Sequence, residues 1–265
     1  MAGIYRNLWY KTCKYGLSLR PDTLFHNAVG LIMYKRFHVP FHWMNTKHPK
    51  TFSEKLNWLK THPVVPNEAE LADKYDVRDF IKRTIGEQYL VPILGVWDNA
   101  DDIDFDKLPN QFVLKLTKGS GYNLICNNKS KLDIRKTRKM LRDWLKVNCY
   151  YFSREPQYKG KSKLIAEEML EYNITDYKFF CFNGEPKYVE LYIDRFGDHK
   201  KLFCDMDWNV AGFTTANDVA KVTVEQPKEF AEMKEVAKKL CKGMTFVRVD
   251  LYVHGGKVYF GEMTF

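Results

Sequence analysis

Three charged residues near the C-terminus could bind a metal ion if a β-hairpin places them on one face. Arg248 and Asp250 precede the glycine pair Gly255-Gly256, and Glu262 follows it. A two-residue turn would put Asp250 and Glu262 on opposite faces, whereas a three-residue turn pairs residue 248 with Glu262. We expect the three-residue turn, because it gathers Arg248, Asp250, Glu262 and Thr264 on one face, where two carboxylates and a hydroxyl suit Mg²⁺. The alternative is an exposed strand face with a salt-bridged arginine.

A lysine followed by a glycine-rich turn could bind phosphate. Lys115 lies in the apolar stretch 112–116, and Gly119, Ser120 and Gly121 follow it closely. Glycines let backbone N–H groups approach phosphate oxygens, and a lysine adds positive charge. A hairpin turn with a surface lysine would show the same pattern.

Two further sets of charged residues could contribute to such a phosphate-binding site. In an extended strand, Asp176, Lys178 and Phe180 share one face, where a carboxylate and a lysine could contact ribose and phosphate. Lys74 and Arg78 share one side of a helix predicted across 68–85. The alternative for the first group is a surface ion pair, and for the second a solvated helix face.

The elements that must position these residues follow from hydrophobic periodicity. Helical spacing predicts helices, and alternation between turn residues predicts strands. Ser53 is the expected cap of the helix that starts near residue 51. The predicted helices cover 4–19, 23–37, 51–62, 68–85, 132–147 and 226–242, and the predicted strands cover 89–97, 112–116, 122–126, 164–168, 177–182, 187–193, 201–204, 245–253 and 257–264. The expected fold class is therefore α/β (α+β), with antiparallel sheets.

The net charge of +9 is concentrated near the N-terminus. Residues 1–60 contain ten Lys or Arg and two acidic residues, whereas the remainder contains thirty-two and thirty-one. Aromatic residues accompany this charge, which favours contact with anionic lipid or a polyanionic glycan through residues 1–60. The alternative is a solvated basic face. We expect no nucleic-acid binding, because no recognition motif accompanies the charge.

Six cysteines are scattered without CxxC or Cys/His spacing. This pattern argues against a zinc site and against a disulfide framework. The sequence shows neither an export signal pattern nor an apolar run long enough to span a membrane. We therefore expect a cytoplasmic protein, with peripheral contact at the inner face of the membrane.

The order of these motifs resembles the ATP-grasp superfamily. Asp73-Lys74, Arg78 and Leu90-Val91-Pro92 resemble its first phosphate-binding segment, and Lys115 with the glycine loop resembles its phosphate loop. The resemblance implies ATP and Mg²⁺ as cofactors, and a fold whose antiparallel sheets enclose the nucleotide. It implies metal ligands at Asp250 and Glu262, catalytic roles for Arg248 and Lys178, and nucleotide contacts from Lys74, Lys115, Gly119, Ser120, Gly121, Glu167, Glu168, Met169, Leu170 and Asp176.

More narrowly, residues 45–265 resemble the TupA-like ATP-grasp family. The resemblance is carried by Lys50–Lys60, Leu71–Tyr75, Phe112–Lys115, Ser120–Asn123 and Asp176–Phe182. It implies a setting in bacterial surface polysaccharide synthesis; the family's namesake is linked to a polymer of amino acid and uronic acid. Thr264 departs from the pattern, because many ATP-grasp ligases have asparagine there. A C-terminus shortened at Phe265 could remove part of the acceptor site.

The reaction implied is amide formation through an acyl phosphate, with a carboxylate and an amine as substrates. A uronic acid or an amino acid is the expected carboxylate. Two alternatives are a glycosyltransferase, suggested by the naming of some family members, and a non-catalytic adaptor of a glycan-synthesis complex. We expect a helical N-terminal segment (1–50), an α/β region (51–110), a small subdomain with the glycine loop (111–170) and a C-terminal subdomain with the metal-binding strands (171–265).

Overall fold

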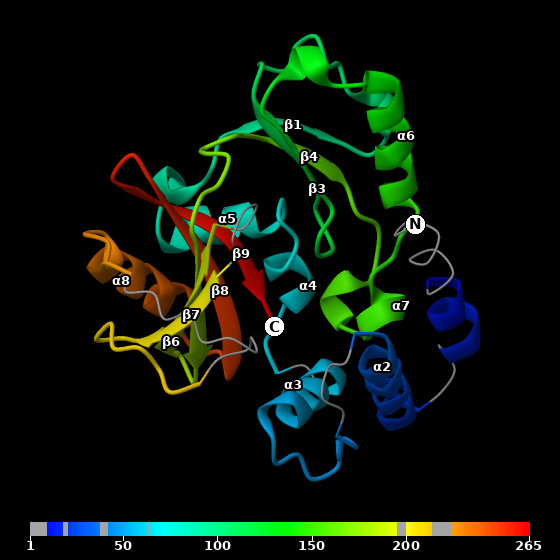
Figure 1. Cartoon of the computed structure of the whole chain (residues 1–265), viewed down its shortest axis with the longest axis vertical. Coiled ribbons are helices and arrows are strands. Elements are labelled where there is room, and N and C mark those ends of the chain that lie inside the picture. Colours follow the sequence, from blue (N-terminus) through cyan, green and yellow to red (C-terminus); the bar gives the residue numbers. More distant parts are fainter. Residues whose placement is uncertain (1–9, 18–20, 38–41, 63, 195–199, 214–223) are drawn as a thin grey trace. The chain divides into compact units, whose positions relative to one another are not determined.

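The computed structural model describes residues 10–17, 21–37, 42–62, 64–194, 200–213 and 224–265. The chain divides into two compact units, and Figure 1 labels their helices and strands. The first contains residues up to 69 together with 146–161, and the second contains 70–145 and 162–265. Part of the predicted helix over 4–19 lies outside the described residues, as do Trp9 and Phe41, two of the aromatic residues of the basic segment 1–60.

The first unit is helical. It contains a π-helical stretch (Thr12–Leu17), α2 (Asp22–Phe37), α3 (Phe52–Thr61), α7 (Tyr150–Ser153) and a 3₁₀ helix (Pro156–Tyr158). The predicted cap of α3 is wrong by two residues. Thr51, not Ser53, is the N-cap, and it forms a capping box with Glu54 in which each side chain accepts the other residue's backbone N–H.

The second unit contains a four-stranded antiparallel sheet. Its strands are β1 (Ile93–Trp97), β2 (Phe112–Leu116), β3 (Asn123–Cys126) and β4 (Leu164–Glu168), in the order β1-β4-β2-β3. Alternation along β2 buries Phe112, Leu114 and Leu116 completely, and α6 (Ile134–Leu145) contributes Leu141 and Trp144 to the core. The side chains between these positions, Val113 and Lys115, therefore lie on the opposite face of the sheet.

A five-stranded antiparallel sheet forms the rest of the second unit. It contains β5 (Asp176–Phe182), β6 (Glu185–Ile193), β7 (Lys200–Asp205), β8 (Phe246–His254) and β9 (Lys257–Thr264), in the order β7-β6-β5-β8-β9. One face is apolar and packs against α8 (Phe230–Leu240), where the rings of Phe179 and Phe230 stack 6.0 Å apart. The mixed α/β class with antiparallel sheets is confirmed.

The helix predicted across 68–85 is interrupted. Residues form α4 (Glu68–Leu71) and α5 (Val77–Thr84), separated by a turn. Asp73 makes this turn, because its Oδ1 accepts the backbone N–H groups of Tyr75 and Asp76 at 2.8 and 3.1 Å. Lys74 therefore lies in a turn and not on a helix face with Arg78. Its backbone N–H donates to the Thr117 carbonyl oxygen at 3.1 Å. Short 3₁₀ helices follow at Glu87–Tyr89, Ala100–Asp102 and Lys129–Lys131.

The predicted register of the β8–β9 hairpin is wrong, although the predicted grouping of side chains is right. His254 pairs with Lys257, so the turn has two residues, and both of its glycines have positive φ. A bulge beyond the turn then shifts the register by one, so that Asp250 lies directly opposite Glu262. Gly261 occupies the bulge, where an added Cβ would lie 3.0 Å from the Asp250 carbonyl oxygen.

The six cysteines are all buried and none forms a disulfide. Within the described residues, every helix is too short or too polar to cross a bilayer.

Candidate functional site

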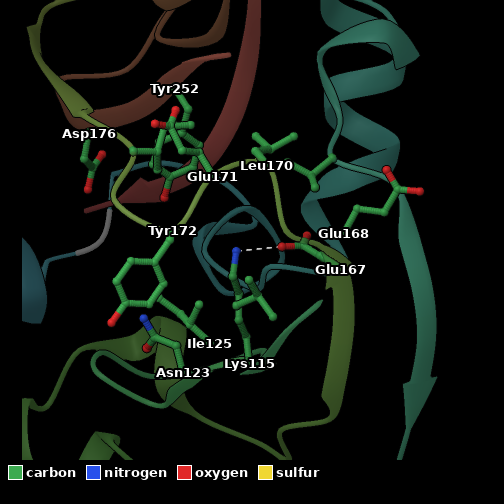
Figure 2. Close-up of a pocket in the computed structure, with 13 residues that line it drawn as sticks. Lys115, Asn123, Ile125, Glu167, Glu168, Leu170, Glu171, Tyr172, Asp176 and Tyr252 are labelled. Carbon is green, nitrogen blue, oxygen red and sulfur yellow. Dashed lines mark hydrogen bonds and ion pairs between the residues drawn. The ribbon is translucent and has the colours of Figure 1, made fainter. Parts of the chain in front are cut away.

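The first part of the site is a carboxylate of β4 held by two cations. Lys115 Nζ on β2 donates to Glu167 Oε2 at 2.6 Å, as Figure 2 shows, and Arg78 Nη1 on α5 lies 3.5 Å from Glu167 Oε1. Burial lowers the pKa of Arg78, and Glu167 opposes that effect. Both carboxylate oxygens of Glu167 are therefore neutralised by side chains from different elements.

The glycine loop after β2 contacts a second lysine. Lys74 Nζ donates to the Gly119 carbonyl oxygen at 3.1 Å. Gly119 and Gly121 have φ values of +131° and +76°, which side-chain-bearing residues rarely adopt, and Ser120 between them is exposed. The structure thus places Lys74 at the loop that the sequence predicted to bind phosphate, although its own segment had been assigned to a helix.

A pocket of about 100 Å³ lies between the polar face of the four-stranded sheet and the start of β5 (Figure 2). Its walls combine apolar side chains with Lys115 and several carboxylates, which is typical of a small-molecule site. Of the residues expected to contact the nucleotide, Glu167, Glu168, Leu170 and Asp176 line this pocket, whereas Met169 is not among the lining residues. The full lining comprises Val91, Val113, Lys115, Asn123, Ile125, Glu167, Glu168, Leu170, Glu171, Tyr172, Ile174, Asp176 and Tyr252.

The second part of the site is an ionic cluster on the face of the five-stranded sheet opposite α8. Lys178 Nζ lies 2.6 Å from Asp176 Oδ2 and 2.5 Å from Asp250 Oδ2. All three residues are buried, Asp250 to 1% exposure. The cluster follows from register, because Lys178 on β5 is directly opposite Asp250 on β8.

Arg248 connects this cluster to β9. Its Nε donates to Asp250 Oδ1 at 2.6 Å, and its Nη2 lies 2.8 Å from Asp250 Oδ2. The same Nη2 donates to Glu262 Oε1 and to Thr264 Oγ1, each at 3.0 Å. Lys74 Nζ is 3.4 Å from Glu262 Oε2, so this lysine contacts both the glycine loop and the cluster.

The charges in this cluster shift its pKa values in opposite directions. Burial, followed by the nearby Asp250, raises the pKa of Asp176 to about 6 although Lys178 opposes this. Burial also opposes ionisation of Glu262, but the cations of Lys74, Arg248 and Lys178 outweigh it and lower its pKa to about 2. Burial alone would lower the pKa of Lys178, yet its two aspartates raise it.

The oxygen atoms around Arg248 fit a divalent cation. Oxygens of Asp250, Glu262 and Thr264 all lie within 3.0 Å of one positively charged atom, Arg248 Nη2. Mg²⁺ favours such oxygen ligands, and usually takes one or two carboxylates together with phosphates and water. Among the described residues, no group of three or more His, Cys, Asp or Glu side chains is placed to hold a metal ion.

Sequence reasoning missed several residues of the site. Tyr252 lines the pocket and alternates with Arg248 and Asp250 along β8, so strand periodicity could have identified it. Asn123 lies directly opposite Lys115 on the neighbouring strand. Tyr172 follows β4 in an irregular segment, where no sequence signal marks it.

Two antiparallel sheets with a glycine loop, paired lysines and a carboxylate pair define the class as an ATP-grasp fold. Residues 54–265 match the family described as TupA-like ATPgrasp, which is most of the chain. The chain therefore belongs to the TupA-like ATP-grasp family. No protein of curated function matches it in sequence.

Several solved structures that are similar to this chain are ligases. An L-amino acid ligase from Bacillus licheniformis is 12% identical with a TM-score of 0.50, and the match covers 89% of this chain and 53% of that protein. Phosphoribosylamine–glycine ligase from Thermotoga maritima is 15% identical with a TM-score of 0.48, and the match covers 82% of this chain and 58% of that protein. D-alanine–D-alanine ligase from Bacillus anthracis complexed with ATP is 16% identical with a TM-score of 0.46, and the match covers 74% of this chain and 55% of that protein. This chain thus spans little more than half the length of each.

Proposed function

We propose that the chain is an ATP- and Mg²⁺-dependent ligase that phosphorylates a carboxylate and joins it to an amine. The observation that carries the proposal is a pocket lined by Lys115 and Asp176, in which Asp176 is linked through Lys178 to the cluster of Asp250 and Arg248. Phosphoryl transfer depends on positioning and charge neutralisation more than on covalent assistance, and this arrangement supplies both. Family membership supports ATP as the phosphoryl donor.

The pocket would hold the nucleoside, and the adjoining lysines would hold the phosphates. Val91, Val113 and Ile125 offer an apolar surface for a base. Asp176 at the pocket edge would accept a ribose hydroxyl. Lys115 Nζ lies at the pocket and Lys74 Nζ lies at the glycine loop, so phosphates that extend from the pocket would meet positive charge.

The ionic cluster would hold the reacting groups, which are the transferred phosphoryl group and the substrate carboxylate. Asp250 and Glu262 would bind Mg²⁺, which would neutralise phosphate charge during transfer. Arg248 would then turn from these carboxylates toward the transferred phosphoryl group or the carboxylate oxygen. Lys178 lies beside Arg248 and would orient the carboxylate substrate.

This assignment implies an exchange of ionic partners. In the structure, Lys74, Lys115 and Arg248 each neutralise a glutamate or aspartate within 3.4 Å. Phosphates would compete for the three cations and the metal would compete for the carboxylates. Because every charge keeps a partner throughout, the exchange avoids leaving a buried ion uncompensated.

The biological setting that we propose is bacterial surface polysaccharide synthesis at the inner face of the membrane. The family resemblance supports the setting. In the first unit, Tyr34 and Trp43 are exposed large side chains and Lys35 is exposed between them in sequence, which supports contact with an anionic lipid or glycan surface.

The test is ADP release by the purified protein with Mg²⁺ and ATP, screened against carboxylic acids with and without amines. Release should require both substrates and should disappear in Lys115→Ala. Lys139→Ala is the matched control, because Lys139 is an exposed lysine of α6 and should leave release unchanged. Full release by Lys115→Ala would contradict the proposal. Absence of ATP binding in a thermal-shift assay would favour the glycosyltransferase or adaptor alternatives.

A further inference from the structure

Aromatic side chains continue the row of the sheet that contains Arg248. Phe180 on β5 is directly opposite Arg248 on β8, and Tyr188 on β6 is directly opposite Phe180. These three side chains therefore lie on the same face as the ionic cluster, in one row that crosses three strands. Neighbouring strands are about 4.8 Å apart, so Phe180 and Tyr188 are about 5 and 10 Å from Arg248 along the row.

Two more rings extend this aromatic surface. The ring of Phe213 is 5.0 Å from that of Tyr188 and 5.2 Å from that of Phe203, which in turn is 5.4 Å from Phe180. Phe203 is buried, whereas Phe180 and Tyr188 are half-buried and Phe213 is 46% exposed. Phe180, Tyr188 and Phe213 thus present ring surface beside the cations.

The spacing suits a particular shape of substrate. A carboxylate held by Arg248 and Lys178 would place the group attached to it over the neighbouring position of the row, which is Phe180. A six-membered ring attached there would reach from Phe180 toward Tyr188. Aromatic side chains offer a large apolar surface to the C–H face of such a ring, and the cations beside them would fix the charged end.

We propose that Phe180, Tyr188 and Phe213 form the subsite for the carboxylate substrate, and that this substrate is a carboxylic acid carried on a six-membered ring. The inference rests on the proposed function, because that function states what happens to the carboxylate once it is bound. Binding at the subsite can nevertheless be measured without turnover. A sugar acid and a carbocyclic acid share this chemistry, and the experiment distinguishes them.

Binding is tested by saturation-transfer NMR on the full chain with Mg²⁺ and a non-hydrolysable ATP analogue. The ring-bearing probes are glucuronate, cyclohexanecarboxylate and benzoate, and the open-chain probes are glycerate and alanine. Phe213→Leu is the main variant, because its side chain is exposed and the fold should tolerate the change. Phe52→Leu is the matched control, since Phe52 is also a phenylalanine exposed to 46%.

We expect ring protons of at least one probe to receive saturation in wild type and in Phe52→Leu. Affinity for that probe should fall roughly three- to tenfold in Phe213→Leu and in Tyr188→Leu. Preference for glucuronate over the carbocyclic acids would identify a sugar acid, and the reverse would identify a carbocyclic acid. Equal binding of open-chain acids, no binding of any acid, or ring binding unaffected by both variants would overturn the proposal.

The proposed function can fail separately. If ring acids bind as expected but no acid and amine pair stimulates ADP release, the subsite stands and the ligase assignment falls. If release is stimulated equally by open-chain and ring acids, and Phe213→Leu leaves KM for the acid unchanged, the ligase assignment stands and the subsite falls. Thermal melting of each variant checks that it is folded.

Discussion

Glu54 in the first unit and Glu262 in the second are glutamates whose pKa is lowered to about 2 by different means. Backbone groups hold Glu54: the N–H groups of Lys50 and Thr51 donate to Oε2, each at 2.9 Å, and that of Asn45 donates to Oε1 at 2.8 Å. Side-chain cations hold Glu262, from Lys74 and Arg248.

The difference separates a structural carboxylate from an exchangeable one. The donors of Glu54 are main-chain groups and cannot leave without unfolding the loop that precedes α3. The donors of Glu262 are long side chains that can rotate toward another anion. An equally low pKa therefore does not identify a functional residue, because it can arise from main-chain donors or from side-chain cations.

The largest expected effect comes from Asp250→Asn. The change leaves Lys178 and Arg248 without their shared carboxylate, which should reduce the free energy of unfolding by about 3–5 kcal/mol. ADP release should fall by at least roughly a hundredfold, because Asp250 also belongs to the proposed metal pair. Urea denaturation and ADP release measure the two effects.

Adding Lys178→Met to Asp250→Asn should recover part of the stability without restoring ADP release. If Asp250→Asn lowers stability and leaves release intact, Asp250 is a structural carboxylate like Glu54. The distinction between a structural carboxylate in the first unit and exchangeable carboxylates in the second would then be wrong.

Gly261→Ala should have the next largest effect on activity. Its Cβ would lie 2.8 Å from Tyr252 Cε2 and 3.0 Å from the Asp250 carbonyl oxygen, so the bulge must shift. We expect about 1–3 kcal/mol of destabilisation and a roughly ten- to hundredfold loss of ADP release. Gly16→Ala is the control, because no atom lies within 4 Å of its added Cβ. Identical behaviour of the two variants would show that the bulge does not set the register of the carboxylates.

Asp176→Asn should change the pH dependence of stability. Since the native pKa is raised from 3.8 to about 6, the folded chain binds this proton more tightly than the unfolded chain. The free energy of unfolding should therefore decrease by at most about 3 kcal/mol as pH rises from about 4 to about 6. The variant should lack this decrease. Denaturation at a series of pH values measures it, and an unchanged profile would contradict the assignment.

The smallest effect on activity is expected from Glu54→Gln. ADP release should not change, but stability should. Because the native pKa of Glu54 is lowered from 4.5 to about 2, its contribution is present above pH 4.5 and disappears as pH falls toward 2, and the variant should lack this acid-dependent loss. Salt of about 1 M should weaken the contribution of Glu262 more than that of Glu54, as comparison with Glu262→Gln would show. Equal salt sensitivity of the contributions of Glu54 and Glu262 would contradict the distinction between a structural and an exchangeable carboxylate.

Local patterns predicted most of the elements but not their pairing. The strand over 112–116 has the predicted bounds, because alternating burial and a following glycine turn determine them. Sequence spacing could not show that Lys115 on β2 would meet Glu167 on β4, since the sheet order is not the chain order.

Single residues account for the two main errors at the site. Asp73 captures two backbone N–H groups and ends a helix that periodicity would continue. Gly261 introduces a bulge that no two- or three-residue turn rule includes. In both cases a local hydrogen-bonding or steric preference prevailed over the regular repeat, and in both it placed residues of the candidate site.

The burial of all six cysteines makes this chain convenient for thiol-directed labelling. Burial raises the pKa of Cys13 to about 12, which disfavours the reactive thiolate there. A cysteine introduced at the exposed Ser120 should therefore react with a maleimide dye ahead of the native thiols. Fluorescence from that dye would report on the glycine loop when nucleotide is added, without prior removal of any natural cysteine.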